Sequence, residues 1–134
     1  MKIYFAGSIR GGRNYAKIYQ QIIEHLSTYG EVFTEHVAHT DQKGEDLQDD
    51  FIYSRDINWI FNSDVIIAEV SNPSLGVGYE LGLAVTKNKK ILCLYQKENS
   101  NKISAMIAGC PNITTVSYKN IEDAKAIINN FLKK

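Results

Sequence analysis

The segment Asp64–Val70 (DVIIAEV) constrains the fold more than any other part of this chain. It is a short, almost continuously apolar run, bounded on both sides by polar and turn-forming residues. Runs of this kind are typical of a central strand in a parallel sheet, where both faces of the strand are covered by other elements. We therefore expect a sheet that lies between two layers of helices.

Further strands and helices alternate along the rest of the chain. The other strand candidates are Lys2–Ala6, Glu31–Thr34, Lys90–Tyr95 and Asn112–Ser117. Apolar residues at helical spacing indicate helices within 15–26, 47–61, 78–86 and 121–131, and Glu35–Asp46 is predicted to be a long polar loop. This alternation predicts an α/β fold, with a flavodoxin-like or Rossmann-like doubly wound sheet of five mainly parallel strands in the order 2-1-3-4-5. A chain of 134 residues accommodates one such domain, over residues 1–134.

Composition and charge exclude several classes of protein. Fifteen Lys and Arg balance fifteen Asp and Glu, so the basic excess that is typical of nucleic-acid binders is missing. No apolar run reaches the roughly 18 residues that span a bilayer, and the N-terminus lacks a signal-peptide core. Cys93 and Cys110 form no CxxC motif, and no set of metal ligands is evident. We expect a cytoplasmic protein without metal or cofactor, which binds neither membranes nor nucleic acid.

The predicted strand order indicates where a ligand should bind. Strands 1 and 3 of the 2-1-3-4-5 order are neighbours, and their connections leave on opposite faces of the sheet. Ligands of doubly wound sheets bind at such a switch point, outside the carboxyl ends of the strands. The loops after the first and third strands are therefore the places to seek chemistry.

The loop after the first strand has the composition of a phosphate site. It reads Gly7-Ser8-Ile9-Arg10-Gly11-Gly12-Arg13 and leads into a predicted helix. Glycines allow a ligand to approach the backbone, the helix N-terminus favours an anion, and Arg10 and Arg13 can clamp phosphate oxygens. No GK[ST] follows, so a single phosphate fits better than a nucleoside triphosphate. The alternative is a flexible turn with two solvated arginines.

The loop after the third strand carries a candidate catalytic carboxylate. It runs over Ser71–Gly82 (SNPSLGVGYELG), and Glu80 is expected in the first turn of the following helix, where the helix N-terminus would keep it ionised. That state suits a nucleophile or an electrostatic stabiliser, although a plain capping role is equally compatible with the pattern. Gly76, Gly78 and Gly82 depart from the GxGxxG spacing, which disfavours a dinucleotide site.

Other polar residues near the expected site have two interpretations each. Asp56 is either a second carboxylate facing the crevice or a solvated partner of Arg55. The same caution applies to the carboxyl groups of Asp64 and Glu69, the first at the wrong end of the sheet and the second within an apolar run. Two further candidates for the pocket are His36, just past the second strand, and Tyr4, on the first.

Four segments together resemble one known family. They are Tyr4–Arg13 (YFAGSIRGGR), Thr34–Val37 (TEHV), Pro73–Gly82 (PSLGVGYELG) and Ser104–Ile107 (SAMI). In this order they resemble the 2'-deoxynucleoside 5'-monophosphate N-glycosidases of the nucleoside 2-deoxyribosyltransferase superfamily. The resemblance extends over nearly the whole chain. The GSIRGGR and SAMI segments are similar to the monophosphate-hydrolysing branch rather than to the branch that transfers bases between nucleosides.

The resemblance implies a reaction in which water replaces the base of a deoxynucleoside 5'-monophosphate. It implies that Glu80 is the nucleophile, that Asp56 is a catalytic aspartate and that Tyr4 lies near the reacting centre. It also implies a homodimer in which Ser104–Met106 completes the neighbouring subunit's site. The substrate-binding positions implied in this way are Gly7, Ser8, Ile9, Arg10, Gly11, Gly12, Arg13, Tyr19, His36, Ser74, Gly76, Ser104, Ala105 and Met106.

Three other functions stay open at the level of sequence. The chain could hydrolyse ribonucleoside monophosphates such as CMP, transfer bases between deoxynucleosides, or bind nucleotides without catalysis. Retention of both Glu80 and Asp56 argues against the last, because a sensor gains nothing from a nucleophile. The sequence does not determine the preferred base, the selectivity for deoxyribose over ribose, or the biological role. It also leaves open whether Asp56 is the general acid or an orienting group.

Overall fold

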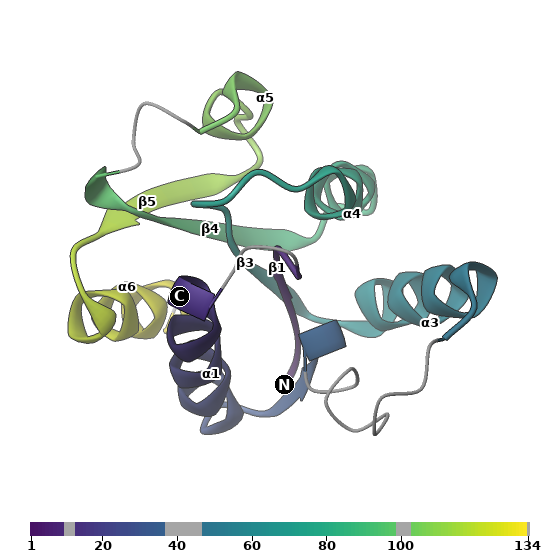
Figure 1. The fold of residues 1–134 in the computed structure, drawn as a ribbon, viewed down its shortest axis with the longest axis horizontal. Helices are drawn as coiled ribbons and strands as arrows, with labels where there is room; N and C mark the ends of the chain where they lie inside the picture. The colour runs from purple at the N-terminus through teal and green to yellow at the C-terminus, as the bar shows by residue number, and fades with distance from the viewer. Residues whose placement is uncertain (10–12, 37–46, 99–102, 134) are drawn as a thin grey trace.

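In the computed structural model, which describes residues 1–9, 13–36, 47–98 and 103–133, five parallel strands form one sheet (Figure 1). The strands are β1 (Lys2–Gly7), β2 (Glu31–Phe33), β3 (Val65–Glu69), β4 (Lys90–Gln96) and β5 (Thr114–Tyr118). Their order is β2-β1-β3-β4-β5, and every neighbouring pair is parallel. The predicted fold class and strand order are confirmed.

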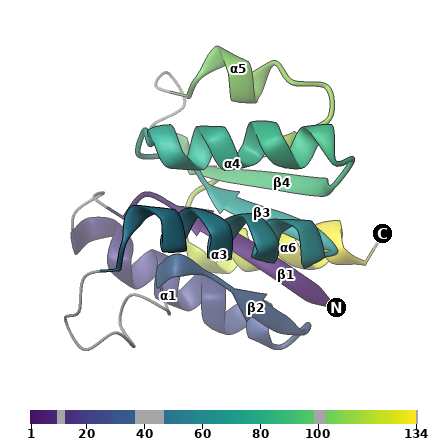
Figure 2. The same cartoon turned by 90° about the vertical axis from the view of Figure 1, so that its right-hand side faces the viewer.

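Helices cover both faces of the sheet. They are α1 (Arg13–Ser27), α3 (Asp49–Asn62), α4 (Leu75–Thr86), the single-turn α5 (Ala105–Ala108) and α6 (Ile121–Leu132). The pair α1 and α6 packs against one face, and the pair α3 and α4 packs against the other (Figures 1 and 2). No helix in the described ranges is long and apolar enough to cross a membrane.

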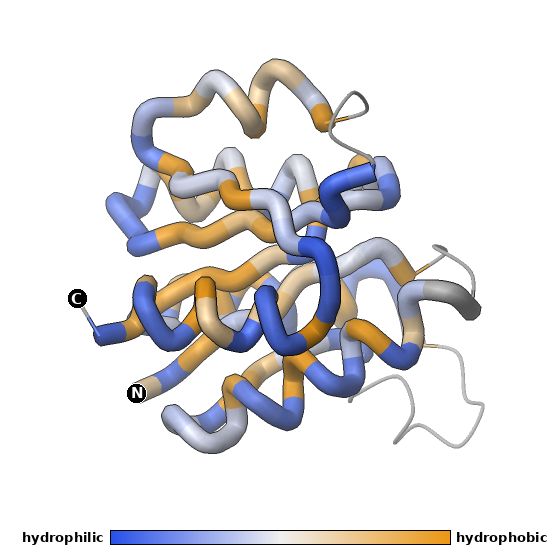
Figure 3. The backbone as a smooth tube through the Cα atoms, turned by 90° about the vertical axis from the view of Figure 1, so that its left-hand side faces the viewer, coloured by the Kyte–Doolittle hydropathy of each residue, from blue (hydrophilic) through white to orange (hydrophobic). Residues whose placement is uncertain are grey.

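The sheet separates the hydrophobic core into two halves. Successive side chains of a strand point to opposite faces, so Val65 and Ile67 of β3 pack toward α1 and α6, whereas Ile66 and Ala68 pack toward α3 and α4. All five residues of β3 are buried. In Figure 3, where the backbone is coloured by hydropathy, the strands at the centre are mostly apolar, and the helices around them alternate between apolar and hydrophilic residues. The double covering explains why β3 reads as a continuous apolar run.

Several element boundaries differ from those that the sequence pattern predicts. The helix that was expected over 78–86 begins at Leu75, because the Ser74 hydroxyl accepts a hydrogen bond from the Val77 N–H at 3.3 Å and caps it. The glycines at 76 and 78 concealed this start. The helix expected from 47 begins at Asp49, and β5 (Thr114–Tyr118) begins two residues later and ends one residue later than predicted.

The strand register brings the two candidate loops together. Gly7, the last residue of β1, pairs with Glu69, the last residue of β3. Because the strands are parallel, the loops that follow them leave from the same edge of the sheet. That edge is the switch point at which the predicted ligand site should lie.

Candidate active site

A cavity of about 810 Å³ opens at this edge of the sheet, on the face covered by α3 and α4. Its walls come from the loop after β1, Glu35 shortly after β2, one side of α3, and the first turns of α4 with the loop before it. The lining residues are Gly7, Ser8, Ile9, Glu35, Asp49, Ile52, Tyr53, Asp56, Ile57, Pro73, Ser74, Leu75, Gly76, Val77, Tyr79 and Glu80. Both loops that were singled out from sequence therefore contribute to one cavity.

Glu80 lines the cavity and is bonded to Tyr4, which lies outside the lining. Tyr4 is buried in β1, and its hydroxyl donates a hydrogen bond to Oε2 of Glu80. Burial raises the pKa of Tyr4 far above its usual range, and the nearby Glu80 and Asp56 carboxylates raise it further, so Tyr4 remains a neutral donor. Tyr4 holds the Glu80 carboxylate in one orientation.

The ionisation of Glu80 differs from the prediction. Because α4 begins at Leu75, Glu80 lies in its second turn, beyond the part of a helix where the N-terminus acts on a charge. Burial raises the pKa of Glu80 to about 7, and the charges of Asp56 and Glu35 act in the same direction, while the hydrogen bond from Tyr4 lowers it. Tyr4, not the helix end, is the group that favours the charged form.

Asp56 combines the two interpretations that the sequence left open. It projects from α3 into the cavity and pairs with Arg55, whose Nε lies 3.0 Å from Asp56 Oδ1. Only 5% of Asp56 is exposed, so the pair is buried and not solvated. The Arg55 guanidinium lies 4.5 Å from the centre of the Trp59 ring, which fixes its place. Burial raises the pKa of Asp56, and Arg55 and Glu35 counteract this.

Glu35 is a site residue that the sequence interpretation missed. It follows β2, lines the cavity and shares a side-chain hydrogen bond with Asp56. Burial and the neighbouring Asp56 charge raise the pKa of Glu35 to about 7, and Arg55 opposes the shift. The two carboxyl groups therefore share a proton near neutral pH, with Glu35 as its carrier. Its position just after the carboxyl end of the second predicted strand was the feature of the sequence that could have indicated a place in the site.

The loop after β1 contributes Gly7, Ser8 and Ile9 to the cavity. Glycine is required at position 7 by close packing, since a Cβ there would lie 3.0 Å from Cζ of Tyr19 and 3.3 Å from Nε2 of His36. Ser8 is buried, and its hydroxyl oxygen accepts a hydrogen bond from Asn72 Nδ2 at 3.2 Å. The predicted contacts of Arg10, Gly11 and Gly12, and of the Arg13 side chain, fall outside the described residues.

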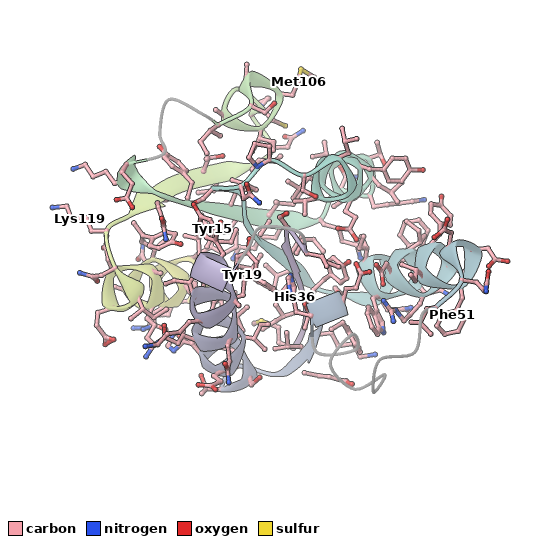
Figure 4. All side chains as sticks on the ribbon, in the orientation of Figure 1. Tyr15, Tyr19, His36, Phe51, Met106 and Lys119 are labelled. Atoms are coloured by element: carbon pink, nitrogen blue, oxygen red, sulfur yellow. The ribbon has the colours of Figure 1, made fainter. Side chains whose placement is uncertain are left out.

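Tyr19 and His36 lie behind Gly7 and not on the cavity wall. Their ring centres are 4.9 Å apart in an edge-to-face arrangement, and His36 Nε2 lies 3.1 Å from the Gly7 carbonyl oxygen (Figure 4). Tyr19 belongs to the half-core under α1. The structure therefore places both residues where they support the first loop, one layer away from the lining that the resemblance assigned to them.

The loop after β3 forms the opposite rim of the cavity. Ser74 and Gly76 both line it, as expected. At Gly76 an added Cβ would meet only the Ser74 hydroxyl, 4.0 Å away, so the backbone there is open to a ligand. Ser74 serves two elements at once, since it caps α4 and faces the cavity.

Ser104, Ala105 and Met106 do not join this cavity within one chain. All three are exposed at the start of α5, and 84% of Met106 is accessible. Figure 4 shows Met106 at the outer end of the molecule, pointing away from the sheet. Their predicted role in a neighbouring subunit's site stays a prediction.

The arrangement determines which chemistry the cavity can support. Across the described ranges, no group of three His, Cys, Asp or Glu side chains is placed to hold a metal ion. The cavity instead offers a carboxylate oriented by a phenol on one wall and a proton-sharing carboxyl pair on another. This combination suits a displacement in which one carboxylate attacks and a second group protonates the leaving atom.

Comparison with known proteins identifies similar chains. The family model described as nucleoside 2-deoxyribosyltransferase matches residues 3–131. A 5-hydroxymethyl-dUMP N-hydrolase of Esox lucius is 48% identical over 140 residues, which cover 99% of this chain and 97% of the relative. The enzyme of the same name from Danio rerio is 52% identical over 128 residues, 91% of this chain and 90% of the relative.

A solved structure shares the fold. The CMP N-glycosidase BcmB of Clostridium botulinum superimposes with a TM-score of 0.72 over 96% of this chain and 99% of its own. The two sequences are 21% identical, so this likeness concerns the fold alone.

Proposed function

The chain belongs to the nucleoside 2-deoxyribosyltransferase family, and from this premise we propose that it hydrolyses the N-glycosidic bond of 2'-deoxynucleoside 5'-monophosphates. The products are the free nucleobase and 2-deoxyribose 5-phosphate. Relatives at about 50% identity over most of their length are named 5-hydroxymethyl-dUMP N-hydrolases, after this type of reaction.

One observation in the structure carries the proposal. Glu80, held by Tyr4, and Asp56, paired with Glu35, face the same cavity from α4 and α3. A transferring or hydrolysing enzyme needs an anion at the sugar and a proton donor at the base. The cavity supplies both functions from separate walls.

In the first step, Glu80 attacks the anomeric carbon of the sugar. Positive charge grows on the sugar as the bond to the base breaks, and the carboxylate stabilises this charge before it bonds to the carbon. The electron pair of the breaking bond goes to the base nitrogen or to an atom conjugated with it. The proton shared by Asp56 and Glu35 neutralises the departing base.

In the second step, water attacks the same carbon and releases Glu80. The oxygen of water bonds to the anomeric carbon, and the electron pair of the bond between sugar and Glu80 returns to the carboxylate. The proton of the attacking water passes to the Asp56 and Glu35 pair, which is thereby restored. Tyr4 stabilises the returning carboxylate by its hydrogen bond.

The 5'-phosphate would be bound between the two loops. Ser8 and Ser74 bring hydroxyl groups to the cavity, and Arg10 follows Ile9 in the same loop. Phosphate binding supplies energy remote from the reacting carbon and positions the sugar for attack. Arg10→Ala should therefore lower kcat/KM for a monophosphate about a hundredfold and spare the free nucleoside. Equal losses for both substrates would argue that the loop binds no phosphate.

The active assembly is proposed to be a homodimer in the cytoplasm. The Ser104–Met106 segment is exposed, with 84% of Met106 accessible, so it is available to complete the site of a second copy of the chain. Cys93 and Cys110 are free thiols, as is common in reducing compartments.

The decisive test is base release from a panel of nucleotides. Purified protein is incubated with deoxy- and ribonucleoside 5'-monophosphates, 5-hydroxymethyl-dUMP included, and with the matched nucleosides, and free base is followed by chromatography. Release from deoxynucleotides alone is the expected result. Glu80→Ala should abolish it, whereas the control Glu122→Ala, an exposed carboxylate on α6, should retain it. A near-normal rate for Glu80→Ala would sink the nucleophile assignment.

The same panel separates the other candidate functions. Cleavage of ribonucleotides would place the chain with the CMP-hydrolysing proteins. Base exchange between nucleosides would indicate a transferase. Binding without release of any base would indicate a nucleotide-binding module.

A further inference from the structure

A second buried carboxylate, Glu69, lies outside the cavity at the end of β3. Its side chain is completely buried and accepts three hydrogen bonds. Oε1 accepts from the Ser71 N–H at 2.8 Å, and Oε2 accepts from the Ser71 hydroxyl at 2.8 Å and from the Tyr118 hydroxyl. No ion pair found in the described part of the chain includes Glu69.

This set of donors is what an ionised carboxylate requires. A carboxylate only accepts hydrogen bonds, and three donors directed at its two oxygens match that capacity. Burial raises the pKa of Glu69, and the hydrogen bonds from Tyr118 and Ser71 lower it. A buried charge without a cation is unfavourable unless such donors surround it, and the proposed reaction does not use this group.

Glu69 connects the ends of three strands. Tyr118 is the last residue of β5, 49 residues away from Glu69 in the chain. The Ser71 hydroxyl, which donates to Glu69, also accepts a hydrogen bond of 2.7 Å from the N–H of Gln96 at the end of β4. Ser71 is therefore bonded to Glu69 of β3 and to Gln96 of β4, and Glu69 in turn is bonded to Tyr118 of β5.

From Ser71 the contacts lead into the cavity. The next residue, Asn72, donates from Nδ2 to the Ser8 hydroxyl on the opposite loop. Pro73 and Ser74, which follow, line the cavity themselves. The position of Ser71 thus determines where two hydroxyl groups stand, those of Ser8 and Ser74.

We propose that Glu69 is a positioning residue for the 5'-phosphate of the substrate. By fixing Ser71, it sets the root of the 71–74 loop and, through Asn72, the orientation of the Ser8 hydroxyl. Glu69 touches no substrate and takes no part in the bond changes. This inference rests on the proposed function and adds to it the group that shapes the phosphate side of the site.

The test compares two tyrosine substitutions that each remove one hydroxyl. Tyr118→Phe deletes a hydrogen bond to Glu69. Tyr29→Phe deletes a matched hydrogen bond, from the Tyr29 hydroxyl to Asn129 Oδ1. Tyr29 lies between α1 and β2 and Asn129 lies on α6, so this bond is far from the end of β5. Both side chains pack against the same half-core, Tyr118 fully buried and Tyr29 partly buried, so the kinetics of the two variants are compared at a temperature well below both Tm values.

We expect Tyr118→Phe to lower kcat/KM for a deoxynucleoside monophosphate about tenfold, through a higher KM and a lower kcat, because phosphate binding both anchors the nucleotide and positions its sugar. The free nucleoside should show unchanged kcat/KM, and Tyr29→Phe should leave both parameters unchanged. Glu69→Gln should raise KM further than Tyr118→Phe does. Glu69→Asp should restore KM only in part, to a value between those of Glu69→Gln and the wild type. Equal kinetics for Tyr118→Phe and Tyr29→Phe, with equal falls in Tm, would overturn the proposal.

A structural readout separates this inference from the proposed function. In amide NMR spectra, Tyr118→Phe should move the signals of Ser8 and Asn72, and Tyr29→Phe should not. If the wild-type chain releases base from no nucleotide, the proposed function fails, and these signals alone decide whether Glu69 positions the loops. Unmoved signals in Tyr118→Phe would refute the positioning role whatever the activity.

Discussion

Three of the carboxyl groups that line the cavity, those of Glu80, Asp56 and Glu35, have raised pKa values, and burial is the largest cause for each of them. Glu80, Asp56 and Glu35 are all half-buried or buried, and Arg55 is the one cation in contact with them among the described residues. Like charges at such distances raise the pKa of their neighbours. Both Glu80 and Glu35 therefore change their protonation state near neutral pH, and the proposed reaction uses the form in which Glu80 is ionised and the Asp56 and Glu35 pair keeps a proton.

Glu35→Gln should shift the acid limb of the pH profile. The Glu35 charge is one of the causes that raise the pKa of Glu80, so its removal should lower that pKa and extend activity toward lower pH. Loss of the shared proton should also lower kcat about tenfold. The measurement is kcat/KM against pH, with Glu31→Gln on the exposed start of β2 as the control. An acid limb that stays in place would contradict the coupling.

Glu80→Gln should stabilise the fold at high pH. The pKa of Glu80 rises from 4.5 to about 7 on folding, so the stability it contributes is complete below pH 4.5 and is lost as pH rises through 7. Glutamine never ionises, and at pH 8 the variant should gain about 1–3 kcal/mol in the free energy of unfolding. Urea unfolding at pH 4 and pH 8 measures the difference. The same gain at both values would show that charge is not its cause.

The sequence singled out three of the residues that meet here, and gave no role to Glu35 or Glu69. Glu80 was a candidate because it lies near a predicted helix start, whereas the roles of Tyr4 and Asp56 came chiefly from the family resemblance; the structure brings the three side chains together. Glu35 was assigned to a polar loop, and Glu69 was set aside within an apolar run. Their environments depend on Asp56 and Tyr118, partners that are distant in sequence and become neighbours only in the folded sheet.

At the level of elements, α4 shows how one residue can serve a helix and a ligand together. Ser74 caps the helix through Val77 and also faces the cavity. The sequence pattern could not locate this start, because two glycines in the first turn lower the apparent helix propensity. Packing of Val77, Leu81 and Ala84 against the sheet overrides that propensity. The misplaced start in turn led to the wrong account of Glu80 ionisation.

Two substitutions of Ser74 should separate its roles. Ser74→Ala removes the cap and the hydroxyl, so stability should fall by about 1 kcal/mol and KM for the monophosphate should rise. Ser74→Asp retains the cap but places a negative charge beside the proposed phosphate site. It should keep wild-type stability while KM rises more than in the alanine variant. Thermal unfolding and steady-state kinetics test the pair; a low KM in Ser74→Asp would place the phosphate elsewhere.

For the whole molecule, the open question of assembly has a direct test in mixed dimers. If Ser104 completes the partner's site, dimers formed from Ser104→Ala and Glu80→Ala subunits contain one site in which both residues are intact. Random mixing should then restore about a quarter of wild-type activity, since half of the dimers are mixed and each has one intact site. Activity that equals the mean of the two unmixed variants would show that each site lies within one chain.

The sheet also divides the molecule into a side with the proposed reacting groups and a side that carries none of them among the described residues. The α3 and α4 face carries the carboxyl groups, whereas the α1 and α6 face packs a separate half-core (Figures 1 and 2). Lys125 on α6 lies on that second face. A surface, bead or fluorescent label coupled through this face would hold the protein with its cavity turned outward, so that an immobilised preparation should exchange nucleotide with the surrounding solution as freely as the dissolved one.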